Sequence, residues 1–537
     1  MLWRVPVRVP QPPQAFSAGP RVSAWMLRLD GVRLALAGVI AVAVAIRVAM
    51  AASPSMPLDG DEAITGIMAT RILGGDLPLF FGVQNYQGAI EQYLQAPLIG
   101  LFGTEAVVLR TIPVMLAAVA CLLTYAVGSR VCGSRWGGVL AASLYAVGPP
   151  YLITKGVLSH GGYGGATVAG LLAMLLALQV RRGAGHQRAL AAGCGLAAGV
   201  ALWENPIGMY LVVPALAWIL GSARSGLRGV APWTAGGLLL GLAPIAAHQI
   251  IHGPSYPYRS NQQPDTGFID RLDGLVDSVL PRFLGVPPEG NLRLVAIILT
   301  VAALSALVLA VCVRRAGLRD MIMLRTTRRQ PIDMVLAGMV LCPIVYALSP
   351  FAWLRTEPRY LFTLYPLAAI AVAAAVVAVP PGRVRSTLAP ILAGAIVLGF
   401  GATAVAQMNG APRAIVTNLG EVASTDIDAA VRGLDAAGVR TAYANYWLAG
   451  PIQFASEDRI SVATGAWTQL PAVEQAVRRS AAPAIIVPMG AGTTSITSRL
   501  RANGHRFDVL RFGTITVVTS IAPLWHPQPT DPVFGAL

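Results

Sequence analysis

Long apolar stretches separated by short polar loops run from residue 31 to residue 407 of the chain. A bilayer core about 30 Å thick is crossed by about 20 apolar residues of α-helix. The pattern therefore predicts an α-helical polytopic membrane protein with about eleven transmembrane helices. The expected spans are residues 31–52, 106–128, 136–153, 161–180, 189–205, 208–222, 229–251, 292–313, 332–349, 360–379 and 387–407.

The loop between the first two spans, residues 53–105, is too long and too regular to be a simple turn. Asp59 can cap a helix, and Glu62, three residues later, completes a capping box. Gly74 and Pro78 are typical of the end of that helix. We therefore expect an extramembrane helix between Asp59 and Gly74.

This expected helix has one apolar stripe, formed by Ile64, Ile67, Met68 and Ile72. A helix of this kind is expected to lie in the membrane interface. At 100° per residue, Asp61 falls within about 20° of the stripe. An acid aimed at the apolar side is costly unless it has a partner or a function. The alternative is that Asp61 only complements the helix dipole.

Three further regions are expected outside the bundle. Residues 1–30, rich in Pro and Arg, are predicted to be a flexible cytoplasmic tail, and the first span an anchor, with cleavage as a signal peptide as the alternative. The second outer loop, 253–291, has apolar residues at helical spacing and is expected to form another interfacial helix or a cover over the bundle. The composition changes beyond residue 407, and residues 408–537 are expected to form a small extracytoplasmic α/β domain. Its expected strands are 441–446, 459–463, 484–487 and 514–519, and its expected helices are 425–437 and 494–502.

The composition agrees with a membrane protein. Apolar residues make up 55% and charged residues 12% of the 537 positions, and the charged fraction is about half that of a soluble domain. The net charge of +15 does not indicate nucleic acid, because the basic residues stand in short runs between apolar stretches. The five cysteines form no CxxC pair and no Cys/His cluster, so we expect neither a disulfide framework nor a cysteine-based metal site.

The arginines predict the topology. Cytoplasmic loops of membrane proteins carry an excess of Lys and Arg, and here every second loop is rich in arginine while the others carry nearly all the acids. We expect a multi-pass protein of the bacterial cytoplasmic membrane, with the first outer loop and the carboxy-terminal domain outside. The arginine-rich loops contain Arg130, Arg135, Arg181, Arg182, Arg188, Arg224, Arg228, Arg314, Arg315, Arg319, Arg325, Arg328, Arg329, Arg383 and Arg385.

Two short motifs resemble a known family. One stretch of the chain is similar to the first outer loop of the C-type (GT-C) glycosyltransferases. It contains Asp61-Glu62, then a helix, then Gly75-Asp-Leu-Pro78, Tyr86 and Phe102-Gly103 before Arg110. More closely, the chain is similar to the bacterial protein O-mannosyltransferase and lipid A aminoarabinose transferase group. The stretch Glu357-Pro-Arg-Tyr-Leu361 also resembles the Arg-Tyr-Leu element of that group.

The resemblance implies a sugar transferase with Asp61 as catalytic base. One departure is visible, because Gln87-Gly88-Ala89-Ile90-Glu91 stands where the group often has His-Pro or Pro-Pro. The resemblance therefore leaves the sugar and the acceptor open, and the acceptor can be a glycan, a lipid or a protein.

The implied donor is a polyprenyl-phosphate sugar. Its phosphate leaves as a stable anion and needs nearby cations more than a general acid, so one base suffices for a single inverting displacement. The cations expected at outer span ends are Arg110, Lys155, Arg355 and Arg359, of which we favour Arg359 and the only lysine, Lys155. Snorkelling to lipid headgroups is the alternative for each.

Further substrate contacts are expected among polar residues at the outer ends of the spans. In a short turn Glu204 can bind sugar hydroxyls, or it can belong to a simple turn. His248, Gln249 and His252 can line the same cavity or serve in packing. Tyr443, Tyr446 and Trp447 can stack on sugars or belong to a core. The full set of expected substrate-binding residues is Asp59, Glu62, Tyr86, Arg110, Lys155, Glu204, Arg359 and Tyr360.

Two other classes of protein have a similar number of spans. A flippase or transporter is the main alternative, although such proteins carry charges within their spans or broken helices in two related halves. A membrane scaffold with a sensing domain does not account for Asp61 or Arg359. We predict no metal ligands, and a requirement for a divalent cation stays open.

Overall fold

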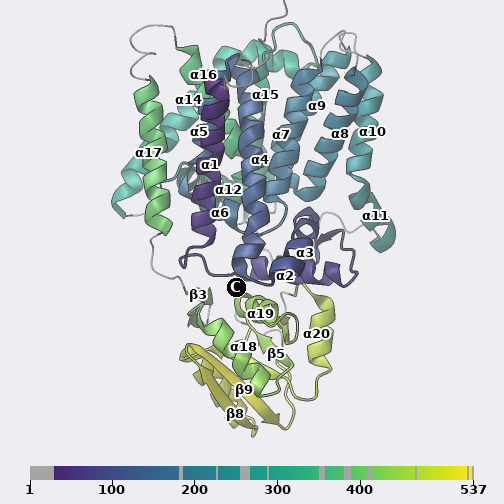
Figure 1. Ribbon diagram of the computed structural model, residues 1–537, viewed down its shortest axis with the longest axis vertical. Coiled ribbons are helices and arrows are strands. Elements are labelled where there is room, and N and C mark those ends of the chain that lie inside the picture. The colour runs from purple at the N-terminus through teal and green to yellow at the C-terminus, as the bar shows by residue number, and fades with distance from the viewer. Residues whose placement is uncertain are drawn as a thin grey trace, which may run out of the picture.

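The computed structural model describes residues 30–180, 186–224, 228–253, 266–286, 290–349, 357–379, 389–408, 414–417, 419–465, 468–528, 531 and 533–534. A helical bundle carries a small α/β domain at one end, which we call the domain-bearing end (Figure 1). Helices α2 (Gly60–Leu73) and α3 (Ile90–Phe102) lie between bundle and domain.

The bundle begins with α1 (Gly31–Ala51), which runs to the domain-bearing end and leads into α2. After α2, a short hairpin of β1 (Phe80–Phe81) and β2 (Gln84–Gly88) precedes α3. The remaining bundle helices are α4 (Ala106–Cys132), α5 (Arg135–Ala146), α6 (Pro150–Val157), α7 (Tyr163–Gln179), α8 (Gln187–Glu204), η1 (Pro206–Gly208), α9 (Met209–Arg224), η2 (Arg228–Val230), α10 (Ala231–Gly241), α11 (Ala243–His252), α12 (Phe268–Gly274), η3 (Leu275–Val279), α13 (Leu280–Phe283), η4 (Gly290–Leu292), α14 (Arg293–Ile322), α15 (Pro331–Leu348), η5 (Pro358–Leu361), α16 (Leu364–Ala378) and α17 (Ala389–Met408).

Every expected span contains helix, but two are broken. The expected span 136–153 is two helices, because α5 ends at Ala146 and Pro150 starts α6 as its first residue. Residues before proline avoid the helical region, so the helix cannot continue through Pro149-Pro150. The expected span 229–251 bends by 50° between α10 and α11.

Among the described residues, four helices are long and apolar enough to cross a membrane: α1, α4, α14 with η4, and α15. The bent pair α10 and α11 makes a fifth if it counts as one span, and four apolar helices are shorter. The expected number of about eleven therefore stays a prediction. The outer face of α14 is strongly apolar, with Val308, Leu309 and Val313 each more than half exposed, as expected for a helix in lipid.

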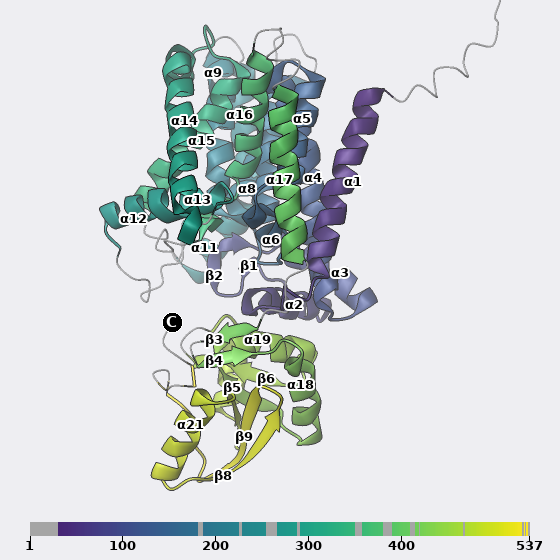
Figure 2. The same ribbon diagram turned by 90° about the vertical axis from the view of Figure 1, so that its left-hand side faces the viewer.

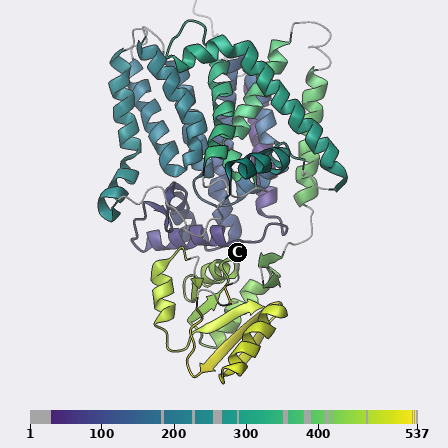
Figure 3. The same cartoon turned by 180° about the vertical axis from the view of Figure 1, so that it is seen from behind.

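The second outer loop forms helix where we expected it. α12, η3 and α13 follow one another on the side of the bundle that faces the viewer in Figure 3. Leu275, Val279 and Phe283 of this segment are buried in the core of the bundle. Arg271 donates a hydrogen bond to the carbonyl oxygen of Ala347 at 2.9 Å. This segment therefore packs against the bundle as a cover, which was one of the two expected arrangements.

The carboxy-terminal domain is a five-stranded mixed sheet in the order β6-β5-β7-β9-β8. The parallel strands β5, β6 and β7 and the antiparallel strand β9 were expected, whereas β8, α19, α20 and the β3–β4 hairpin were not. One face of the sheet packs on α18 and α19 and the other on α20 and α21. The elements are β3 (Ile415–Thr417), β4 (Gly420–Val422), α18 (Asp426–Ala436), β5 (Thr441–Ala444), α19 (Tyr446–Ala455), β6 (Ser461–Ala463), α20 (Pro471–Arg478), β7 (Ala484–Pro488), α21 (Ala491–Ala502), β8 (Arg506–Phe512) and β9 (Ile515–Ala522).

Candidate active site

Helix α2 starts as its sequence predicts. Asp59 is its N-cap, and the Asp59 carboxylate accepts a hydrogen bond from the backbone N–H of Glu62 at 2.9 Å. The expected capping box is incomplete, because the Glu62 side chain turns to Arg110 instead of back to Asp59. Gly74 ends the helix as expected.

The apolar stripe of α2 does not face lipid, which corrects our expectation of an interfacial helix. Ile64, Ile67 and Met68 are buried in a cluster that includes Phe454 of α19. The stripe faces protein because the carboxy-terminal domain lies directly against α2, a contact between segments almost 400 residues apart. Helix α2 is thus packed between bundle and domain (Figure 2).

Asp61 lies on α2 at the junction with the carboxy-terminal domain. The Tyr446 hydroxyl, at the start of α19, donates a hydrogen bond to Asp61 Oδ1 at 2.6 Å. Burial and the neighbouring Asp61 carboxylate raise the pKa of Tyr446 well above its usual value, so the phenol keeps its proton. We expected Tyr446 to stack on a sugar or to belong to a core, and the structure instead places it on the candidate base.

Glu62 and Arg110 form a fully buried ion pair. Arg110 donates to Glu62 Oε1 at 2.9 Å and to Oε2 at 2.6 Å, and also to the carbonyl oxygens of Ala51, Met56 and Pro57. The Arg110 side chain is 2% exposed and that of Glu62 0%. Both residues therefore hold the connection between α1 and α2, and we do not carry them forward as substrate contacts.

A chain of charged side chains links Asp59 to Arg359. His160 contacts Asp59 Oδ2 through its Nε2 at 2.7 Å and contacts Lys155 through its Nδ1. Because Lys155 can only donate, Nδ1 accepts and the His160 Nε2–H donates to Asp59. Lys155 also lies 3.8 Å from Glu357, and Arg359 donates to Glu357 Oε2 at 2.7 Å.

The charges of this chain support one another. Burial alone would raise the pKa of Glu357, but Lys155 and Arg359 outweigh it and hold that pKa at about 2. Burial would likewise raise the pKa of Asp59, whereas His160 and Lys155 bring it well below its usual value. Burial and the nearby Arg359 lower the pKa of Lys155. One carboxylate, Glu357, therefore faces two cations.

Arg359, at one end of this series of contacts, interacts electrostatically with Asp61. Burial would lower the pKa of Arg359, but Tyr163, Glu357 and Asp61 raise it well above its usual value. Burial raises the pKa of Tyr86, whose charged neighbours are Arg359 and Asp61. The expected residues Asp59, Asp61, Tyr86, Lys155 and Arg359 are therefore brought into one electrostatic neighbourhood.

Tyr360 belongs to the same neighbourhood. Tyr360 follows Arg359 directly along η5. The next residue but one to Arg359 along η5, Leu361, is buried in the bundle core. The Glu357-Pro-Arg-Tyr-Leu361 motif thus supplies a charged pair and a tyrosine to the site, and anchors them.

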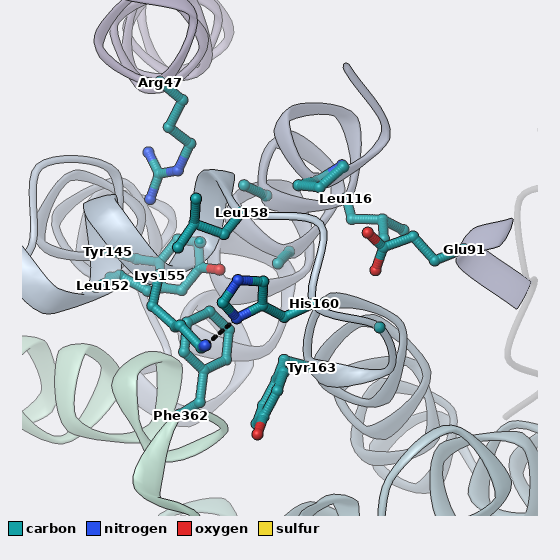
Figure 4. A pocket seen from close by; sticks show the side chains of 16 residues that line it. Arg47, Glu91, Leu116, Tyr145, Leu152, Lys155, Leu158, His160, Tyr163 and Phe362 are labelled. Atoms are coloured by element: carbon teal, nitrogen blue, oxygen red, sulfur yellow. Dashed lines mark hydrogen bonds between the residues drawn. The ribbon is translucent and has the colours of Figure 1, made fainter. Parts of the chain in front are cut away.

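Behind the charged chain lies an enclosed cavity of about 20 Å³, room for about one water molecule. Lys155, His160 and Tyr163 line it (Figure 4), while Asp61 and Arg359 do not. Arg47 of α1 points into it. The Arg47 side chain is buried, and among the described residues neither its Nε nor its Nη2 has a hydrogen-bond partner. A buried guanidinium without a carboxylate is costly, so Arg47 is an exception to the apolar bundle interior.

Glu204 is placed away from the Asp61 junction. It is completely buried under the β2–α3 turn, where one oxygen accepts a hydrogen bond from the Ile90 N–H at 3.2 Å. A Cβ at Gly88 or Gly165 would come within 2.3 Å of the Glu204 carboxylate. The close packing of these glycines covers the carboxylate, so we do not carry Glu204 forward as a sugar-binding residue.

The other residues that we expected to line the cavity or to stack on sugars lie in other parts of the molecule. His248 packs against Phe80 and His252 on α11. Tyr443 is buried in the carboxy-terminal domain, where its hydroxyl lies 2.9 Å from His526 Nδ1. Arg355 lies outside the described residues. In the part of the chain that the structure describes, no group of three or more His, Cys, Asp or Glu side chains could hold a metal ion.

Sequence reasoning missed five residues of this site: Arg47, Tyr151, His160, Tyr163 and Glu357. Tyr151 donates a hydrogen bond to Glu357 Oε1 at 2.9 Å. Glu357 stands within a motif that we noted but did not assign, and Arg47 is a lone charge inside an apolar run, which is itself a signal. No local pattern singles out His160 or Tyr151, whose partners are distant in sequence.

No protein-family model and no curated protein matches the chain. The helical bundle with its small carboxy-terminal α/β domain defines a GT-C-like membrane fold, and the chain shares it with solved structures. The fold is similar to that of ArnT from Cupriavidus metallidurans bound to undecaprenyl phosphate, with a TM-score of 0.58 and 12% identity over 94% of this chain and 100% of that chain. The apo state of the same ArnT gives 0.58 and 13% over 92% and 99%. The archaeal oligosaccharyltransferase AglB from Archaeoglobus fulgidus, in complex with an inhibitory peptide and a dolichol-phosphate, is more distant, with a TM-score of 0.44 and 13% identity over 79% and 63%.

Proposed function

We propose that the protein is a glycosyltransferase that transfers a sugar from a polyprenyl-phosphate donor to an acceptor hydroxyl, with inversion at the anomeric carbon. The observation that carries the proposal is the series of contacts that runs from Arg359 to Asp59, two residues before Asp61 at the start of α2. This arrangement stands on a fold similar to that of ArnT, which has been solved with undecaprenyl phosphate.

In this proposal Asp61 is the general base. The acceptor oxygen attacks the anomeric carbon while its proton passes to the Asp61 carboxylate. The phosphate leaves with the electron pair of the broken carbon–oxygen bond. A phosphate is already a good leaving group, so no general acid is required, and nearby cations stabilise the charge that it gains.

Arg359 and Lys155 are the residues that we propose for the phosphate. Both cations already contact the same carboxylate, Glu357, and in the proposal the phosphate becomes a second anionic partner of the same two side chains. Lys155 is further oriented by His160 and, through it, by Asp59. Tyr86 and Tyr360 are the proposed sugar contacts, because both lie beside Arg359 and carry hydroxyl groups.

We further propose that the domain-bearing end faces the outside of a bacterial cytoplasmic membrane. Two contacts support this topology, because each involves an arginine of the expected cytoplasmic loops, at the end of the bundle opposite the domain. Asp30 before α1 pairs with Arg135 of α5, and Arg329 donates to the carbonyl oxygen of Trp218 in α9 at 2.6 Å. Arginine-rich loops face the cytoplasm in such proteins.

The experiment is a reconstitution of the whole protein in liposomes with a panel of radiolabelled polyprenyl-phosphate sugars, with and without divalent cations. We expect one donor to lose its label to a glycan, lipid or protein acceptor, and NMR of the product to show the opposite anomeric configuration. Movement of intact lipid between leaflets without any cleavage of the sugar–phosphate bond would instead support a flippase.

A further inference from the structure

The contact between Tyr446 and Asp61 joins the two parts of the molecule at the candidate base. Tyr446 is the first residue of α19, a helix capped by the Asn445 side chain, which accepts from the Trp447 N–H. The Asn445 side chain also donates to the Phe534 carbonyl oxygen at 2.8 Å. The tyrosine is thus held by the carboxy-terminal domain while its hydroxyl meets a residue of the bundle.

The docking of α19 on α2 fixes this contact closely. A Cβ at Gly66 would come within 2.3 Å of the Phe454 ring, and one at Gly450 would come within 3.0 Å of the Ala63 Cβ. At the far end of α2, Arg71 donates to Asp458 Oδ2 at 3.1 Å and 3.0 Å. The packing of Phe454 and Ala63 against these two glycines, with the Arg71–Asp458 ion pair beyond them, leaves α19 little freedom to slide along α2.

The hydroxyl of Tyr446 imitates an acceptor. In the proposed reaction, an acceptor O–H must donate a hydrogen bond to the Asp61 carboxylate before its proton is transferred. The Tyr446 O–H does so to Oδ1 at 2.6 Å. We propose, resting on the proposed function, that Tyr446 occupies the acceptor subsite in the idle enzyme, and that this subsite takes a hydroxyl carried on a ring, as on a saccharide.

The shape of the space supports a ring-borne hydroxyl. The Tyr446 ring lies against the bare backbone of Gly60, where an added Cβ would come within 2.9 Å of Cε1. The Trp447 ring stands edge-on to it, with the centroids 5.2 Å apart. When Tyr446 moves away, a slot the size of one six-membered ring opens beside Asp61. An extended peptide hydroxyl from Ser or Thr would leave this slot unfilled.

The occupied subsite also protects the donor. With Tyr446 in place, Asp61 Oδ1 already accepts a hydrogen bond, so in this proposal water must compete with the phenol before it gives its proton to Asp61 and attacks the anomeric carbon. An acceptor that displaces Tyr446 frees Asp61 Oδ1 and at the same time donates its own hydrogen bond to that oxygen. Binding of the correct acceptor thus becomes the condition for chemistry.

The first test replaces Tyr446 by Phe, which keeps the ring and removes the hydroxyl. Donor hydrolysis in the absence of acceptor should rise about tenfold or more in Tyr446→Phe, the scale of one hydrogen bond to a charged group. Tyr443→Phe is the matched control, because its hydroxyl contacts His526 inside the same domain, and its hydrolysis rate should equal that of the wild type. Unchanged or slower hydrolysis in Tyr446→Phe would overturn the proposal and make Tyr446 a residue that only positions Asp61.

The second test opens the slot and fills it with a probe. Tyr446→Ala should transfer the sugar to added phenol and form a phenyl glycoside, whereas the wild type should form none. A Tyr446→Ala enzyme that hydrolyses donor but never glycosylates phenol would contradict a ring-shaped subsite. If Tyr446→Ala does not fold, the Phe variant still decides the proposal. A wild-type protein that cleaves no polyprenyl-phosphate sugar would refute the proposed function itself, and this result is distinct from both others.

Discussion

The two ends of the bundle hold their charges in different ways. At the domain-bearing end, Glu62 and Arg110 are buried, and Arg71 meets Asp458 across 387 residues. At the opposite end the buried Asp333 pairs with Arg314 from the adjoining helix, only 19 positions away. The other charges there border an open groove of about 480 Å³ that is lined by Arg315, Arg319, Asp320, Arg325 and Arg328.

This difference separates two uses of arginine in one membrane protein. Burying ionic groups carries a desolvation cost, so a cluster of buried charges contributed by distant segments is expected where the protein has a function for it. Arginines that stay exposed to water at one end of the bundle are explained by the orientation of the protein in the membrane alone. We therefore expect the proposed reaction at the domain-bearing end, whereas the arginines at the other end set the orientation of the protein in the membrane. Substitutions at each end test these two expectations.

The largest effect should come from Asp61. Asp61→Asn keeps the size of the side chain and an acceptor oxygen for Tyr446 but removes the base, so the transfer rate should fall by about 10²- to 10⁴-fold. Donor binding should be unchanged, because the proposed phosphate contacts are intact. Initial rates and equilibrium binding of the radiolabelled donor measure the two quantities, and equal transfer by Asp61→Asn would exclude Asp61 as the base.

Glu62 tests the buried pair by stability alone. Glu62→Gln leaves Arg110 buried without a counter-charge and should lower the free energy of unfolding by about 3–5 kcal/mol. Asp458→Asn is the control, because the Arg71–Asp458 pair is about a quarter exposed and should cost no more than about 1 kcal/mol. Denaturant unfolding of both variants in detergent gives the comparison, and similar losses would mean that burial makes no difference.

Glu91 predicts how stability depends on pH. Burial raises its pKa from 4.5 to about 7, so the folded state holds the proton more tightly than the unfolded state. Its contribution is fully present below about pH 4.5 and is lost as the pH rises through about 7, a change of about 3 kcal/mol. Glu91→Gln should remove this slope in melting temperatures recorded from pH 4 to pH 8, and an unchanged slope would assign the dependence to another group.

Arg47 should show a gain in stability. Arg47→Met removes a buried guanidinium with two unpartnered nitrogens and keeps an apolar side chain of similar length, which should stabilise the fold by about 1–3 kcal/mol. Arg47→Lys keeps the charge and should not. A loss of stability in Arg47→Met would show that the hydrogen bonds of Arg47 to the carbonyl oxygens of Ala43 and Ala146 outweigh the cost of burying its charge.

The smallest effects should come from the opposite end. Arg319 and Arg325 are exposed, so Arg319→Gln and Arg325→Gln should each change stability by less than about 0.5 kcal/mol and leave transfer close to the wild-type rate. A large loss of transfer in either variant would show that the groove at that end takes part in the reaction.

Local signals explain which parts of this structure the sequence could predict. The spans follow from the length of their apolar runs, and the start of α2 follows from Asp59, because caps depend on neighbours in sequence. The strands β5, β7 and β9 follow from alternating and buried β-branched residues. The break between α5 and α6 was also readable, since Pro149-Pro150 stands in the printed sequence, but the apolar character on both sides concealed it.

The site was only partly predictable, because its pairs join segments far apart in the chain. Asp61 and Arg359 were found through motifs, whereas Tyr446 lies 385 residues from Asp61 and His160 lies 101 residues from Asp59. The apolar stripe of α2 was read as lipid-facing, since a sequence does not say whether lipid or a protein domain covers a hydrophobic face. Tertiary packing, and not local propensity, decided each of these points.

The most direct measurement is a structure of the protein with undecaprenyl phosphate, determined in lipid nanodiscs. The phosphate should lie at the domain-bearing end, in contact with Arg359 or Lys155 and on the same side as the Asp61 carboxylate. A phosphate bound instead in the groove of Arg315, Arg319 and Arg328 would contradict the assignment of chemistry to the domain-bearing end.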